Sequence, residues 1–141
     1  MTIYIPQLKG LPNQKVRLLA HAAHFSVTES DGTVTAFAYD WPDLRVVINV
    51  MPKTELAKHL EGFVDFIRQG CMRLRRPIDS SLEQRILSTT LVLGFVVEAK
   101  AQRDCWQDRV QEMMGTIAFN TGSLVFWEGR IFDEGAKPLF P

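Results

Sequence analysis

The stretch SSLEQRILSTTLVLGFVVE, Ser80–Glu98, decides the fold of this chain. Its part from Ile86 to Val97 carries no charged side chain, which predicts a place in the middle of the core. If the whole stretch were one helix, the C-terminal half would be an all-α bundle. A short helix followed by a buried strand would instead make the chain α+β or α/β.

Two features divide this stretch into a helix and a strand. Ser80 and Glu83 have the S-x-x-E spacing of a capping box, which predicts a helix over 81–88. The residues after it are mostly β-branched or aromatic and include Gly94, and such residues are unfavourable in a helix but common on a pleated sheet. We therefore expect a central strand over about 90–98 that is buried on both faces.

The N-terminal half has the pattern of an antiparallel three-strand meander. Asp31-Gly32 is a strong tight-turn signal between strands expected over 25–29 and 33–39. A second turn at 40–43 leads into a third strand over 44–50. Because apolar side chains alternate along the second and third strands, one face of this meander should point to the core.

Helical spacing of apolar residues predicts further helices over 13–24, 53–69 and 104–120, the second of them ended by Gly70. Near the C-terminus, Glu128-Gly129 predicts a short hairpin that an extended tail follows. We therefore expect a single α+β domain over residues 1–141, with a mostly antiparallel sheet and helices packed chiefly on one face. The order of helix, three-strand meander and helix resembles that of small bacterial secretion-chaperone-like domains.

Composition narrows the class of partner. Sixteen basic residues balance sixteen acidic ones, so the chain lacks the broad positive field of non-specific nucleic-acid binding. The same balance gives little colloidal repulsion, which is compatible with a homodimer. The longest uncharged run is shorter than the ~20 apolar residues of a membrane span. Two cysteines are too few for a disulfide framework, so we expect a cytoplasmic protein. From the charge balance and the short uncharged run we expect no nucleic-acid or membrane partner.

An arginine cluster and two tryptophans are the candidate binding residues. Arg68, Arg73, Arg75 and Arg76 could hold a phosphate or an acidic partner through forked hydrogen bonds, or simply keep a connecting segment solvated. Trp41 and Trp127 stand beside turns, where exposed aromatic side chains would anchor a partner and buried ones would fill the core.

No motif in the sequence indicates catalysis or a metal site. His21 and His24 lack an HExxH context, the chain has no glycine-rich phosphate loop, and neither Cys71 nor Cys105 has a histidine beside it. We therefore expect no metal and no cofactor, and a non-enzymatic domain of adaptor, chaperone-like or immunity type that binds another protein or itself. The alternative is a small enzyme in which Cys105 or a histidine acts with the arginine cluster as an anion clamp.

Overall fold

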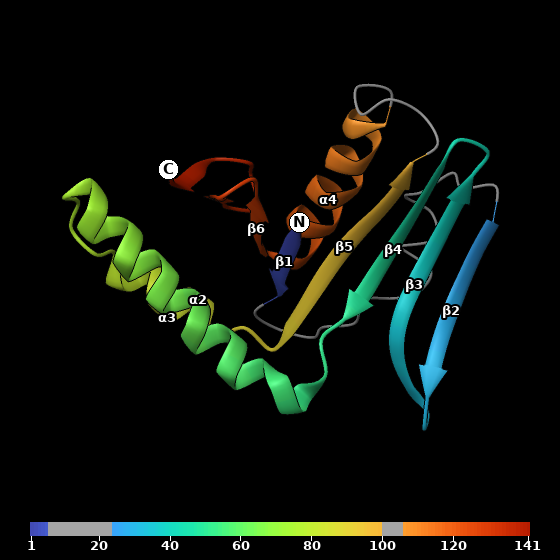
Figure 1. Cartoon of the computed structure of the whole chain (residues 1–141), viewed down its shortest axis with the longest axis horizontal. Helices are drawn as coiled ribbons and strands as arrows, with labels where there is room; N and C mark the ends of the chain where they lie inside the picture. Colours follow the sequence, from blue (N-terminus) through green and yellow to red (C-terminus); the bar gives the residue numbers. More distant parts are fainter. Residues whose placement is uncertain (6–23, 100–105) are drawn as a thin grey trace.

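The computed structural model describes residues 1–5, 24–99 and 106–141. Over these residues the chain forms one antiparallel sheet of eight strands together with three helices, which confirms the α+β class (Figure 1). The strands are β1 (Thr2–Ile5), β2 (His24–Ser30), β3 (Thr33–Trp41), β4 (Leu44–Val50), β5 (Leu91–Ala99), β6 (Leu124–Trp127), β7 (Arg130–Phe132) and β8 (Pro138–Phe140). The helices are α2 (Lys53–Leu74), α3 (Ser80–Leu87) and α4 (Gln107–Thr121). The helix expected over 13–24 lies outside the described residues up to position 23, and His24 already begins β2.

The deciding stretch divides into a helix and a strand, as its composition predicts. Helix α3 buries Ile86, and β5 follows after a break of three residues. Strand β5 pairs with β4 on one side and with β1 on the other, so it is a central strand. Its buried Val92 and Leu93 point to opposite faces of the sheet, because successive side chains on a strand alternate.

The start of α3 differs from the expected capping box. The Asp79 carboxylate caps the helix, since its Oδ1 accepts hydrogen bonds from the backbone N–H groups of Ser81, at 2.9 Å, and of Leu82, at 3.2 Å. Helix α3 therefore begins at Ser80 and the expected role of Ser80 as the cap is wrong. The Glu83 carboxylate accepts hydrogen bonds from Arg68 and not from a backbone N–H at the start of the helix.

Helix α2 continues beyond the glycine that was expected to end it. Its last residue is Leu74, and Arg75 then takes a left-handed conformation at φ 51°. The N–H groups of Arg75 and Arg76 donate to the carbonyls of Met72 and Cys71, which satisfies the end of the helix. Gly70 lies inside the helix, where its lack of a side chain admits the ring of Phe140 from β8.

The order of strands in the sheet is β2-β3-β4-β5-β1-β6-β7-β8. The expected meander forms β2, β3 and β4, and the N-terminal strand β1 lies between β5 and β6, with Ile3 opposite Leu93 and Val125. The turns Asp31-Gly32 and Glu128-Gly129 each place two successive residues at positive φ, the requirement of a type I′ hairpin turn.

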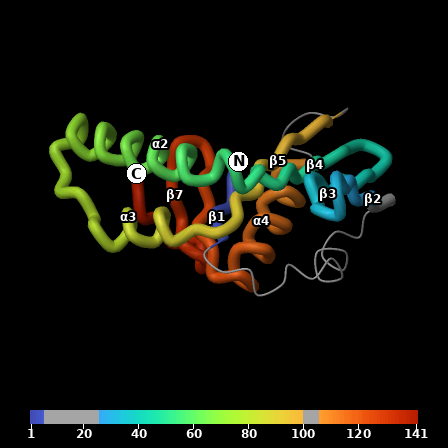
Figure 2. The backbone as a smooth tube through the Cα atoms, turned by 90° about the horizontal axis from the view of Figure 1, so that it is seen from below, coloured from blue at the N-terminus to red at the C-terminus, as the bar shows by residue number. Residues whose placement is uncertain are grey.

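The helices divide between the two faces of the sheet. On β1, Ile3 and Ile5 belong to a core cluster with α4, whereas Tyr4 belongs to a second cluster with α2 and α3. Two of the three described helices, α2 and α3, therefore share one face of the sheet, and α4 covers the other face. Figure 2 shows that the connection from α2 to α3 forms one end of the molecule and β2 the opposite end.

Candidate functional site

The structure separates Arg68 from the other arginines of the cluster. Its Nε and Nη2 donate to the two carboxylate oxygens of Glu83 at 2.8 and 3.1 Å, so the pair joins α2 to α3. The hydrogen bonds from Arg68 hold the pKa of Glu83 below its ordinary value, and both groups stay charged. Arg68 therefore already has a structural partner in Glu83.

The other three arginines lie where α2 ends. Arg73, Arg75 and Arg76 are exposed, and within residues 1–5, 24–99 and 106–141 no carboxylate forms an ion pair with them. The nearest acidic residues along the chain are already engaged, since Asp79 caps α3 and Glu83 binds Arg68. This end of the molecule therefore carries three arginines that form no ion pair with a described residue, and the Asp79 carboxylate lies three positions beyond Arg76.

Three exposed apolar side chains lie among or beside these arginines in the sequence. Met72 is 74% exposed, Leu74 49% and Ile78 48%. Leu74 follows the buried Ile67 and Cys71 at helical spacing, so it extends the buried face of α2 beyond the part that the rest of the core covers. We call residues 72–78 the α2–α3 tip.

The two tryptophans lie on the α4 side of the sheet, away from the arginines of the tip. Trp41 is half-buried, its ring packs near Tyr39, and the guanidinium of Arg109 lies 5.7 Å from its ring centroid. Arg109 also donates to both carboxylate oxygens of Asp43, which lowers the pKa of Asp43. Trp41 therefore helps to hold the β3–β4 turn against α4, and the structure does not join it to Arg73, Arg75 and Arg76.

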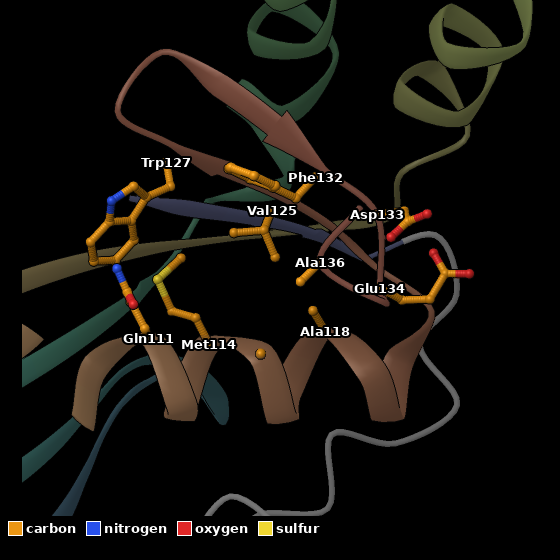
Figure 3. A pocket seen from close by; sticks show the side chains of 10 residues that line it. Gln111, Met114, Ala118, Val125, Trp127, Phe132, Asp133, Glu134 and Ala136 are labelled. Atoms are coloured by element: carbon orange, nitrogen blue, oxygen red, sulfur yellow. The ribbon is translucent and has the colours of Figure 1, made fainter. Parts of the chain in front are cut away.

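Trp127 borders a cavity of about 250 Å³ between α4 and the C-terminal strands (Figure 3). The helix side is one stripe of α4 at positions i, i+3, i+4 and i+7, and the strand side is mainly apolar. The lining residues of the helix are Gln111, Met114, Gly115 and Ala118, and those of the strands are Val125, Trp127 and Phe132.

Two carboxylates and Ala136 from the β7–β8 connection complete the lining. Glu134 accepts a hydrogen bond of 2.8 Å from Arg85 of α3, which lowers the pKa of Glu134. Asp133 Oδ1 accepts from the backbone N–H groups of Gly135, at 2.9 Å, and of Lys137, at 2.8 Å. The cavity thus joins apolar walls to an acidic end.

Sequence reasoning singled out Trp127 but not the cavity beside it. The α4 wall of the cavity combines Met114 and Ala118 of the helix's apolar face with Gln111 and Gly115 at the border of that face. Which strand packs against that border depends on the order of the sheet, which no local pattern contains.

The candidate catalytic residues do not form a site in the described part of the chain. Cys71 is 5% exposed and lies in the core cluster of α2 and α3, and His59 lies near Tyr4. Cys105 and His21 lie outside the described residues, as does the side chain of His24. No group of three potential metal ligands occurs among the residues that the structure describes. In the same residues, no helix combines the length and the apolar character of a membrane span.

Comparison with protein-family models, with curated proteins and with solved structures finds no match to this chain.

Proposed function

We propose that this chain is a protein-binding domain whose α2–α3 tip binds an acidic, amphipathic segment of another protein. The observation that carries the proposal is the coincidence, over seven consecutive residues, of three arginines without ion pairs and three exposed apolar side chains. Guanidinium groups form forked, charge-assisted hydrogen bonds with carboxylates, which supplies the polar half of the recognition.

The apolar contacts with the partner come from exposed side chains that lie next to the buried face of α2. Since Leu74 extends the buried face of α2, apolar side chains of a partner would pack on it as an extension of the existing cluster. Removing apolar surface from water contributes roughly 25 cal/mol per Å², so these side chains supply affinity that exposed charges alone do not.

The small number of basic residues at the tip favours an acidic protein segment over an anionic membrane or DNA as the partner. The chain as a whole has a formal net charge of zero, and only three arginines face solvent at the tip. Electrostatic docking to anionic membranes commonly uses about 4–8 clustered basic residues, and salt-dependent DNA binding about 6–10 phosphate contacts. The tip also repels a second copy of itself, so self-association through this surface is disfavoured and the partner is a different chain.

The test reverses charges at the tip and, as a matched control, elsewhere. The variant Arg73→Glu/Arg76→Glu leaves the helix-ending residue Arg75 in place, and the control Lys58→Glu/Arg130→Glu changes the net charge equally at exposed positions. Binding of a labelled helical peptide with one acidic and one leucine-rich face is measured by fluorescence anisotropy. Because each exposed ion pair contributes ~0.2–1 kcal/mol and reversal adds repulsion, the tip variant should bind about tenfold more weakly.

The control variant should bind this peptide like the unchanged protein. A peptide of equal charge without leucines should bind weakly, since it cannot use Leu74 and Ile78. The proposal fails if the protein does not bind the amphipathic peptide at millimolar concentration, or if both double variants lose affinity equally. Tighter binding to anionic vesicles or to duplex DNA than to the peptide would also overturn it.

A further inference from the structure

The cavity beside α4 exists because two helix positions that face the strands carry little or no side chain. Gly115 and Ala118 lie one turn apart on the stripe that faces β6 and β7. A Cβ added to Gly115 would meet no atom within 4 Å, so the space next to it is open. At about 250 Å³ the cavity is slightly smaller than the ~300–1,000 Å³ of drug-sized pockets, which suits a small ligand.

The walls of the cavity favour a ligand with an apolar or aromatic body. Trp127, Phe132 and Val125 form the wall opposite α4, and Met114 faces them from the helix (Figure 3). Aromatic faces carry negative electrostatic potential and attract cations, most strongly on tryptophan. An ammonium group therefore gains from these walls, whereas a carboxylate does not.

The end of the cavity away from Trp127 is acidic. Asp133 and Glu134 both lie there, and the charge of Asp133 raises the pKa of Glu134, in opposition to the larger effect of Arg85. Arg85 compensates Glu134, but no basic side chain of the described ranges forms an ion pair with Asp133. This end therefore keeps one negative charge that is not compensated.

We propose that the cavity between α4 and the β6–β7 hairpin binds a small organic ammonium compound, with its apolar body against Trp127 and Phe132 and its ammonium group beside Asp133. Arg85 is already hydrogen-bonded to Glu134, so it is not available to pair with an anionic ligand at this end. The site is separate from the α2–α3 tip, and neither proposal depends on the other.

The experiment uses three probes that share a phenyl ring on a short chain: 2-phenylethylammonium, 2-phenylethanol and 3-phenylpropionate. Binding is followed through the Trp127 indole N–H signal in ¹H–¹⁵N NMR spectra, which the variant Trp127→Phe assigns. The ammonium probe should shift this signal saturably and bind about tenfold more tightly than the neutral alcohol. The anionic probe should bind most weakly.

Two variants distinguish the contribution of the cavity's open space to binding from that of the Asp133 charge. Gly115→Leu fills the cavity from a helix position with open space, so it should abolish binding of the ammonium and alcohol probes while the protein stays folded by circular dichroism. Asp133→Asn keeps an oxygen to accept the N–H groups of Gly135 and Lys137 and removes only the charge. It should weaken binding of the ammonium probe about tenfold and leave binding of the alcohol probe unchanged.

The control Asp108→Asn removes a carboxylate from the exposed first turn of α4 and should change neither affinity. Equal affinity for the ammonium and the alcohol overturns the proposal, and so does unchanged binding to Gly115→Leu. Absence of any saturable shift with 2-phenylethylammonium overturns it as well.

Discussion

Gly70 of α2 and Phe140 of β8 are in such close contact that a Cβ on Gly70 would lie 2.5 Å from Cζ of the ring. Because β8 pairs with β7, the ring has little room to retreat. Gly70→Ala gains up to ~1 kcal/mol of helix propensity but meets overpacking that costs about 1–3 kcal/mol. We expect a net decrease in the free energy of unfolding, measured by urea titration.

Gly62→Ala is the matched control within the same helix. A Cβ there meets no atom within 4 Å, so the substitution should raise the free energy of unfolding by ~0.5–1 kcal/mol. Replacing Phe140 by leucine should reduce the harm done by Gly70→Ala, a coupling that a double-mutant cycle measures. If both alanine variants stabilise the protein equally, the contact with Phe140 does not constrain Gly70.

A second prediction concerns His59, whose Nε2 lies 3.1 Å from the Tyr4 hydroxyl. Burial lowers the pKa of His59 below its ordinary value of 6.5. The unfolded chain therefore binds a proton more readily than the folded protein as the pH falls through 6.5. The stability should be highest above this value and decrease below it, until the folded protein is protonated as well.

The measurement is the free energy of unfolding of the protein and of His59→Gln at a series of pH values from neutral to mildly acidic. The other two histidines are present in both proteins, so the difference between the two profiles reports on His59. The variant should lose part of the decrease below pH 6.5. Parallel profiles would show that His59 titrates alike in the folded and unfolded states.

Elements that local chemistry determines could be predicted from the sequence. Asp31-Gly32 and Glu128-Gly129 both form the expected turns, because each contains a glycine, the residue that accepts positive φ most readily. The strand after residue 90 forms as expected, since its valines, Phe95 and Gly94 are all less favourable in a helix than in a strand or turn. These signals need no knowledge of distant residues.

Features that depend on distant residues could not be predicted in this way. The position of β1 between β5 and β6 depends on pairing with Leu93 and Val125, far along the chain. For the same reason Gly70 looked like a helix end, since its actual partner, Phe140, is next to the last residue. The cavity beside Trp127 also arises only when β6 and α4 come together.

A third prediction tests the cap of α3. Asp79→Ala removes the carboxylate that accepts from two backbone N–H groups, and the loss of such a cap costs about 0.5–2 kcal/mol. Ser80→Ala removes the side chain that the capping-box pattern had favoured, and we expect it to change the free energy of unfolding very little. If the two variants lose the same free energy of unfolding, the Ser80 side chain also contributes to capping α3.

The last prediction concerns the ion pair that joins α2 to α3. The hydrogen bonds from Arg68 lower the pKa of Glu83 below its ordinary value of 4.5, so the folded protein holds this carboxylate ionised more strongly than the unfolded chain does. Its contribution to stability should be present above pH 4.5 and be lost as the pH falls through the folded value.

Glu83→Gln removes this titration and should flatten the acid side of the stability profile. It should also make the stability less sensitive to salt, because the Arg68 side chain is half exposed and salt screens its charge. The control Glu61→Gln changes an exposed carboxylate of α2 without an ion pair to any described residue and should keep both dependences. If Glu83→Gln and Glu61→Gln give the same acid profile, the Arg68–Glu83 pair does not couple the two helices in solution, and the orientation of the α2–α3 tip depends on the buried contacts of Leu82 and Ile86 alone.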